Sequence, residues 1–208
     1  MGQNCAGNAC AGGSAGSNEV IEVTYFDLGY ARADPLIQLL QHSGANWKFH
    51  GETFETWGKR KAAGDTGEFG ALPIVKQGKR VIDLSIPALR TLGIELGYYP
   101  LGDYKACGQV DMVAETYSDV FDLWANALLN QETSNEQKAE AFNNSLAEGT
   151  GAAWKLFNLV TTVLDGTGKK FIGGDKPSIA DCCMTSLLFN FVKNDQNPMS
   201  QLLKPTVR

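Results

Sequence analysis

The residues best suited to binding chemistry lie at the start of a helix that the sequence predicts from Ser85 onward. Ser85 stands in an N-cap position, and Pro87 falls in the first turn, where the missing N–H of proline costs nothing. Ile86, Leu89 and Leu92 then follow helical spacing. The free N–H groups and partial positive charge of a helix N-terminus favour an anion such as a carboxylate. The helix start is therefore either an anion-binding site or an ordinary end to the hairpin before it.

A proline interrupts the strand-like run that comes just before this helix. Residues 71–75 form a short apolar run that contains Pro73, a turn follows at residues 77–79, and a second apolar run covers 80–84. Proline within such a run normally marks an edge strand or a bulge. It is also typical of a cis X-Pro bond, which is rare enough to be kept for a reason. Both interpretations fit a strand, turn, strand, helix unit over residues 69–93.

The chain before this unit alternates strand and helix. Strand-forming residues predict a strand over 20–26, an apolar face predicts a helix over 32–42, and a second strand is expected at 46–51. Residues 52–69 are expected to be irregular. Strand, helix, strand followed by strand, strand, helix is the order of a thioredoxin-like fold, so we predict an α/β domain of that type over residues 18–97.

These features resemble the glutathione-binding half of the glutathione transferases. The phrases VTYF and ARAD resemble the first strand and helix start of the sigma-like class. This resemblance places Tyr25 on the catalytic tyrosine and Arg32 on the arginine that supports it. It places Trp57 and Lys61, four residues apart, on the pair that contacts the glycyl carboxylate of glutathione.

The same resemblance assigns roles around the proline and the helix start. Leu72-Pro73 matches a cis peptide whose backbone groups meet the cysteinyl part of glutathione, so we expect this bond to be cis. Ser85 matches the serine that holds the γ-glutamyl carboxylate. Glu115 stands near an acidic residue that reaches the amine of the partner subunit's glutathione. Two positions depart from the family, since Leu84 replaces a usual glutamine and Ala71 replaces a usual lysine.

The chemistry that the resemblance implies is activation of the glutathione thiol. A thiol with a pKa of about 8.5 is only a few per cent thiolate at neutral pH, and the thiolate is the nucleophile. A hydrogen bond from the Tyr25 hydroxyl to the sulfur would stabilise the charged form, at about 1.4 kcal/mol for each unit of pKa. Arg32 is expected to add positive potential, and Tyr30 in the same loop is the alternative donor.

From residue 98 onward the sequence pattern is helical. Apolar residues at helical spacing predict one long amphipathic helix over 110–128 and a second helical stretch over 142–164, which glycines kink or break. Ser178 and Asp181 form a capping box that opens a further helix, and we interpret them as structural. We therefore predict an all-α domain over residues 98–208.

The N-terminal segment, residues 1–17, is rich in glycine, alanine and serine and is expected to be a flexible tail. Gly2 begins an N-myristoylation pattern, and Cys5 or Cys10 could take a second acyl chain, although Ala6 stands where serine or threonine is preferred. Any association with a membrane is expected to depend on such acylation.

Composition argues against several classes of function. The 18 basic and 23 acidic residues give a formal net charge of −5 without a basic cluster, which argues against nucleic acid binding. No apolar run reaches the roughly 18 residues of a membrane span. The five cysteines and two histidines show no metal-ligand spacing, so no metal is expected. An odd cysteine count without a secretory signal favours a reducing, cytoplasmic location.

We therefore expect a cytoplasmic glutathione transferase, with a thioredoxin-like α/β domain followed by an all-helical domain. It would use glutathione as co-substrate, conjugate it to small electrophiles in a detoxification role, and form a homodimer. Isomerase or peroxidase chemistry would use the same thiolate, and the sequence does not identify the electrophile. Only sixteen residues follow Val192, so we expect a C-terminally shortened member. The alternative is a catalytically weak structural subunit of a larger assembly, consistent with Leu84, Ala71 and the short end.

Overall fold

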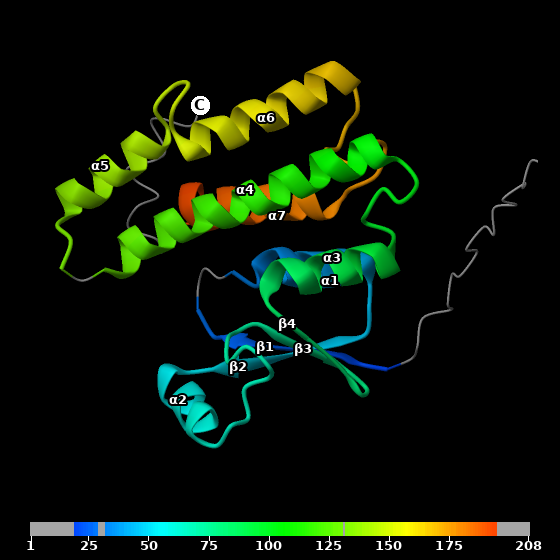
Figure 1. Cartoon of the computed structure of the whole chain (residues 1–208), viewed down its shortest axis with the longest axis vertical. Coiled ribbons are helices and arrows are strands. Elements are labelled where there is room, and N and C mark those ends of the chain that lie inside the picture. Colours follow the sequence, from blue (N-terminus) through cyan, green and yellow to red (C-terminus); the bar gives the residue numbers. More distant parts are fainter. Residues whose placement is uncertain (1–18, 29–31, 131, 195–208) are drawn as a thin grey trace, which may run out of the picture.

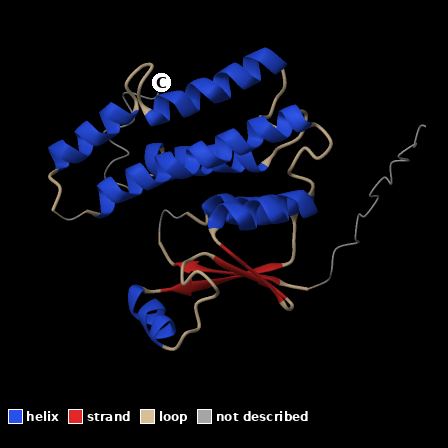
Figure 2. Ribbon diagram, in the orientation of Figure 1, coloured by secondary structure: helices blue, strands red, loops and turns tan. Residues whose placement is uncertain are grey.

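The computed structural model describes residues 19–28, 32–130 and 132–194 of the chain (Figure 1). The expectations for the acylated tail, for Tyr30 and for the end beyond residue 194 lie outside these residues. The described elements form two parts, a sheet with its helices and a group of helices alone (Figure 2). None of the described helices is long and apolar enough to cross a membrane.

Four strands form one mixed sheet in the order β2-β1-β3-β4. β1 pairs in parallel with β2 and antiparallel with β3, and β3 pairs antiparallel with β4. Ile21, Val23, Thr24 and Tyr25 of β1 are buried, as expected for a strand with a neighbour on each side and helices over one face. The bounds are Ile21–Phe26 (β1), Trp47–Glu52 (β2), Ile74–Gln77 (β3) and Arg80–Asp83 (β4). The thioredoxin-like arrangement predicted from the order of elements is confirmed.

Three helices accompany the sheet: α1 (Asp34–Ser43), α2 (Phe54–Ala62) and α3 (Ser85–Leu96). α1 and α3 lie together on one face of the sheet, whereas α2 stands apart at its end (Figure 2). α1 and α3 bury apolar stripes, which include Leu36, Leu39, Leu89 and Leu92. The prediction of an irregular stretch over 52–69 was wrong because α2 is mostly polar and buries only Trp57, so it has no apolar stripe to detect.

The described residues of the second part form four α-helices and a short π-helical turn. The long helix predicted over 110–128 is confirmed as part of α4, whereas the stretch over 142–164 divides into two helices. Gly151 lies at the division, and a Cβ there would come within 2.1 Å of the Ser145 carbonyl oxygen, so only glycine fits this close approach. The bounds are Tyr104–Leu129 (α4), Asn135–Ser145 (α5), Ala152–Thr167 (α6), Ile179–Leu187 (α7) and Leu188–Val192 (η1).

One apolar core extends through both parts of the molecule. It contains buried residues of β1, α1 and α3 together with those of α4 and α7. On α4, the buried Trp124 stacks on Phe142 with ring centroids 5.2 Å apart, and its indole N–H donates to the Ser145 hydroxyl at 2.8 Å. Burial of an aromatic side chain of this size with its polar atom satisfied is strongly stabilising. The core therefore fixes the helices that face the sheet.

The capping box predicted at the start of α7 is present and should contribute measurably to stability. The Asp181 carboxylate accepts hydrogen bonds from the Ser178 N–H, the Ser178 hydroxyl and the Ile172 N–H, at 2.8, 2.7 and 3.1 Å. We expect Asp181→Ala to lower the free energy of unfolding by about 2–4 kcal/mol, measured by denaturant titration. Asp175→Ala, which removes an exposed carboxylate paired with Lys169, should cost less than about 1 kcal/mol. Equal losses would show that the box has no special role.

Candidate functional site

The register of the sheet brings the predicted site residues to one edge. Tyr25 near the end of β1 lies opposite Gly51 of the parallel β2, and Thr24 lies opposite Ile74, the first residue of β3. Ile74 in turn lies opposite Asp83, the last residue of β4. The ends of β1 and β2, the start of β3 and the end of β4 therefore meet at the same edge. Two of these strands lead into helices: α2 begins shortly after the end of β2, and α3 begins shortly after the end of β4.

Tyr25 presents a buried phenol whose proton is available for donation. Its side chain is 8% exposed and packs with Ala33, Ile37 and Leu72. The backbone N–H of Arg32 donates to the phenol oxygen at 3.3 Å. Burial raises the pKa of Tyr25 above its ordinary value of 10.0, while the Arg32 N–H opposes this rise. The hydroxyl thus stays protonated at neutral pH and is suited to donate a hydrogen bond to an anion.

The Arg32 side chain points to the helical part of the molecule. Its guanidinium forms an ion pair with Asp122, donates to the Ser118 hydroxyl at 3.2 Å and lies over the Phe121 ring at 5.3 Å from the centroid. All three partners belong to α4. Much of the positive charge is therefore matched by Asp122, and the direct link from Arg32 to Tyr25 is the backbone N–H. These contacts could not be predicted from the sequence, because Arg32 and its partners on α4 lie 86 or more residues apart.

The predicted cis peptide Leu72-Pro73 is confirmed, and it lies beside the start of α3. The N–H of Leu84 donates to the carbonyl oxygen of Pro73 at 3.2 Å, which joins the two segments. The first hydrogen bond within the helix runs from the Ala88 N–H to the Leu84 carbonyl, so Leu84 is the N-cap. The prediction that Ser85 is the N-cap was wrong by one residue, because the backbone of Leu84 turns at a φ of 70° and the helix starts directly after it.

The N-terminus of α3 keeps its donors available. No backbone acceptor among the described residues receives the N–H groups of Ser85 and Ile86. The Ser85 hydroxyl makes no hydrogen bond to a described residue either, although Ser85 is buried. Three donors therefore converge at a helix N-terminus, where the peptide dipoles favour negative charge. This is an arrangement that can bind a carboxylate.

α2 supplies a second group that can bind an anion. The Lys61 ammonium lies 5.7 Å from the centroid of the Trp57 ring, and the Arg60 guanidinium lies 5.8 Å from it. Lys59 pairs with Glu55, and Arg60 pairs with Glu52 and Asp65. Within the described part of the chain Lys61 has no carboxylate partner. Of the three cations Lys59, Arg60 and Lys61, it is therefore the one whose charge is free to bind an anion.

Glu115, expected from the resemblance to reach a partner subunit, lies on α4 and pairs with Arg90 of α3 at 2.8 Å. Arg90 also pairs with Asp111, whose other oxygen accepts from the Tyr99 hydroxyl at 2.9 Å. The Glu115 side chain is 62% exposed. Within one chain, Glu115 therefore belongs to a link between α3 and α4 and is not part of the group around Tyr25.

Asp83 is a further residue at this edge that the sequence did not indicate. One carboxylate oxygen accepts the N–H groups of Glu68 and Phe69, at 2.6 and 3.3 Å, and so holds the loop that leads to Pro73. The other oxygen is buried and has no hydrogen-bond partner among the described residues. In that same part of the chain, no group of three or more histidine, cysteine or acidic side chains is arranged to hold a metal ion.

Comparison with known proteins relates this geometry to a fold. No protein family model matches the sequence, and no curated protein matches it. Solved structures do match. NaGST-2 aligns with a TM-score of 0.70 at 20% identity, over 90% of both chains. A Nu-class glutathione transferase from Haemonchus contortus aligns with a TM-score of 0.67 at 23% identity, over 91% of both. The chain has the glutathione transferase fold. Monomeric Na-GST-3 from Necator americanus is similar too, with a TM-score of 0.69 at 20% identity, over 90% of this chain and 91% of that one.

We expect Tyr25 to remain protonated at pH values where an ordinary tyrosine ionises. Because burial raises its pKa above 10.0, the folded protein binds this proton more tightly than the unfolded chain does. The resulting stabilisation is present below the unfolded-state pKa and is lost as the pH rises through the folded-state value. Wild type and Tyr25→Phe differ by one tyrosine, so titration of their tyrosinate absorbance measures it. The two curves should separate only above about pH 10; separation at lower pH would contradict the expectation.

Proposed function

We propose that the protein is a glutathione transferase that conjugates the glutathione thiolate to small electrophiles. The observation that carries this proposal is the convergence, at one edge of the sheet, of a protonated Tyr25 hydroxyl with the cis Leu72-Pro73 peptide and the open N-terminus of α3. Similarity of fold to glutathione transferases supports it. The proposal includes two domains, over residues 18–97 and 98–208.

Glutathione carries a carboxylate at each end, and the edge offers a binding group for each. The γ-glutamyl carboxylate would accept hydrogen bonds from the Ser85 hydroxyl and from the free N–H groups at the α3 N-terminus. The glycyl carboxylate would meet the Lys61 ammonium and the Trp57 indole N–H. The backbone next to Pro73 would hydrogen-bond the cysteinyl residue between them. Leu84 contributes its backbone only, since its side chain has no polar atom.

Tyr25 would act on the sulfur as a hydrogen-bond donor. Its raised pKa keeps Tyr25 as the neutral phenol at neutral pH, so it already carries its proton and the thiol proton goes to solvent. The phenol then stabilises the thiolate that remains by donating a hydrogen bond to it. The thiolate then forms a carbon–sulfur bond with the electrophile, and the leaving group departs with its bonding electrons. Arg32 would assist by placing its N–H on the phenol oxygen, with its side chain held on α4.

The finer assignment follows the sequence resemblance. We place the protein in the sigma-like class, as a cytoplasmic enzyme with a detoxification role, and any membrane association would come from acylation at Gly2 and at Cys5 or Cys10. The alternative, a catalytically weak structural subunit, rests on the changes at Leu84 and Ala71. Binding and turnover of glutathione separate the two, because a purely structural subunit needs neither.

We expect wild type to be retained on immobilised glutathione, to elute with free glutathione and to conjugate an activated aryl halide. Tyr25→Phe should bind glutathione within about twofold of wild type and lose at least about tenfold in turnover, since the hydroxyl acts on the thiolate and each 1.4 kcal/mol changes a rate tenfold. The readouts are a binding titration and steady-state kinetics. A wild-type protein that binds no glutathione would overturn the proposal. Unchanged turnover in Tyr25→Phe would remove the role of Tyr25.

We further propose a two-fold symmetric homodimer in which Glu115 reaches the amine of the partner's glutathione. The Glu115 side chain is 62% exposed despite its contact with Arg90, so it can serve both groups. Sedimentation should give twice the 22.5 kDa of one chain, and Glu115→Gln should raise the KM for glutathione about threefold to tenfold, as expected for one charge-assisted contact. One structural neighbour is described as monomeric, so sedimentation at the mass of one chain is the contrasting result. A stable monomer that conjugates glutathione would refute both the dimer and this role.

A further inference from the structure

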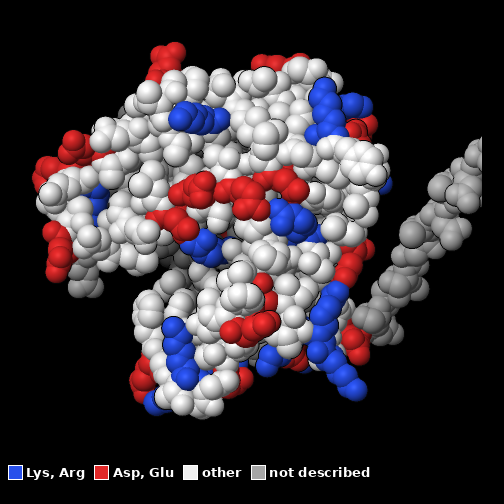
Figure 3. Space-filling model, in the orientation of Figure 1, with Lys and Arg blue, Asp and Glu red and all other residues white. Residues whose placement is uncertain are grey.

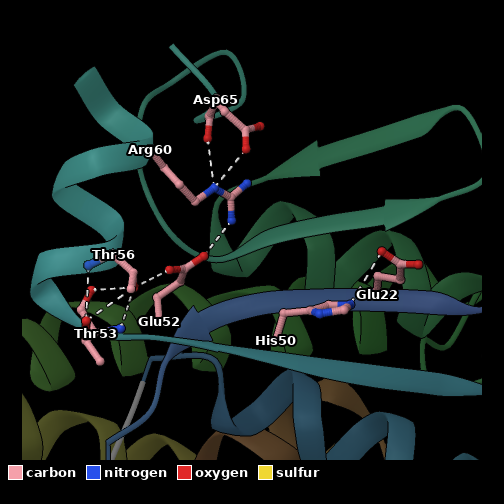
Figure 4. A network of polar contacts seen from close by, with 7 residues as sticks. All are labelled: Glu22, His50, Glu52, Thr53, Thr56, Arg60 and Asp65. Carbon is pink, nitrogen blue, oxygen red and sulfur yellow. Dashed lines mark hydrogen bonds and ion pairs between the residues drawn. The ribbon is translucent and has the colours of Figure 1, made fainter. Parts of the chain in front are cut away.

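Arg60 forms a half-buried polar junction between α2 and its surroundings (Figure 4). One terminal nitrogen donates to Glu52 Oε1 at 2.7 Å, while Nε donates to Asp65 Oδ2 at 3.0 Å and to the Asp65 carbonyl oxygen at 3.2 Å. The Arg60 side chain is 23% exposed and that of Glu52 only 10%. The planar guanidinium can reach both carboxylates at once, which the single ammonium of a lysine cannot do with the same geometry.

These contacts determine where α2 lies. The helix buries only Trp57, so apolar packing alone holds it weakly. At its start, the Thr56 hydroxyl donates to Glu52 Oε2 at 2.5 Å within the Thr53–Thr56 capping box, and at its end Arg60 reaches the other oxygen of the same carboxylate. Glu52 is the last residue of β2. Both ends of the helix are therefore tied to one point at the edge of the sheet, as Figure 4 shows.

The same guanidinium also fixes the side chain that supports Lys61. Arg60 and Lys61 both contact the Trp57 ring, at 5.8 and 5.7 Å from its centroid. Two carboxylates hold the Arg60 guanidinium in place, and the Trp57 ring packs against this fixed cation. The Trp57 indole N–H makes no hydrogen bond to a described residue, and Lys61 has no carboxylate partner there. Both polar groups remain available to a ligand.

We infer that Arg60 is a positioning residue for the glycyl carboxylate of glutathione, acting through Trp57 and Lys61 without touching the ligand. This inference rests on the proposed function and adds to it a residue from outside the binding group. It also assigns a purpose to an arginine between two lysines. Among the described residues the flanking Lys59 pairs only with Glu55 of its own helix, whereas Arg60 ties the helix to the sheet and to the following loop.

The inference predicts different effects on the binding of two ligands that differ only in the glycyl residue. Glutathione carries the glycyl carboxylate, and γ-glutamylcysteine lacks it. We expect Arg60→Met to raise the Kd of glutathione about fivefold to tenfold, which is less than the value of a whole charge-assisted contact because Lys61 and Trp57 remain. The Kd of γ-glutamylcysteine should change less than about twofold. With glutathione, KM should rise in parallel, and kcat and the pH dependence of kcat should not change, because Tyr25 and the sulfur are unaffected.

Four companion variants and one double variant make the experiment decisive. Lys59→Met removes a neighbouring exposed cation and should leave both dissociation constants within about twofold. Lys61→Ala should reproduce the selective loss for glutathione, and adding Arg60→Met to it should have little further effect, since both act on the same contact. Arg60→Lys should recover part of the affinity. Glu52→Gln keeps the shape of the side chain and removes the charge that pairs with Arg60. It should show the same selective loss for glutathione, and it replaces Arg60→Met as the test if Arg60→Met does not fold.

The outcomes are distinct. Equal losses for glutathione and γ-glutamylcysteine in Arg60→Met and Glu52→Gln would show that the junction only stabilises the fold and would overturn the inference. Unchanged glutathione affinity in both variants would overturn it too. If wild type binds neither ligand, the proposed function itself fails, and this is seen before any variant is measured.

Discussion

The register of β1 between its two neighbours is the constraint on which the rest of the site depends. β1 is parallel to β2 and antiparallel to β3, so one edge of the sheet receives the end of a strand that leads to α2 and the start of a strand that follows the cis proline. A slip of one residue would turn Tyr25 to the other face of the sheet. The burial of Ile21 and Val23 in the core opposes such a slip, because the slip would also move both side chains off the core face of the sheet. The hydrophobic core thus sets the geometry of the polar edge.

The two parts of the molecule are joined by a shared core and oriented by ion pairs along α4. Figure 3 shows a row of acidic side chains across the molecule at the level of this helix, which carries Asp111, Glu115, Asp119 and Asp122. Arg90 from α3 pairs with Asp111 and Glu115, and Arg32 pairs with Asp122. Partly exposed pairs contribute little free energy, whereas the common core contributes much more. The ion pairs therefore mainly set how the helices are oriented. Through the Arg32 side chain, α4 helps to hold the backbone N–H of Arg32 that donates to the Tyr25 hydroxyl.

How far the sequence predicts this structure depends on the kind of interaction involved. The long α4 was predictable because apolar periodicity records burial in the sequence itself, and β1 was predictable because its residues are strand formers. α2 was missed because charged and polar contacts hold it, and these leave no period. The availability of Lys61 was also hidden, since it depends on which neighbouring cations find carboxylates, and Asp65 and Glu52 reach Arg60 only in the folded chain. The N-cap of α3 was predicted one residue too late, because the positive φ of Leu84 is a backbone feature that the identity of a leucine does not predict.

The backbone turn at Leu84 decides whether a leucine in place of the glutamine expected from the resemblance disrupts the N-terminus of α3. Among the described residues, Leu84 is the only non-glycine with a positive φ, at 70°. Such a conformation costs about 1–3 kcal/mol and persists only where the surroundings impose it. Here the surroundings are the Pro73 carbonyl, which accepts the Leu84 N–H, and the hairpin that ends at Asp83. The side chain, 37% exposed, does little to fix it. The backbone that orients Ser85 and the first N–H groups of α3 is therefore kept, so leucine at this position leaves in place the donors that we propose to bind a carboxylate.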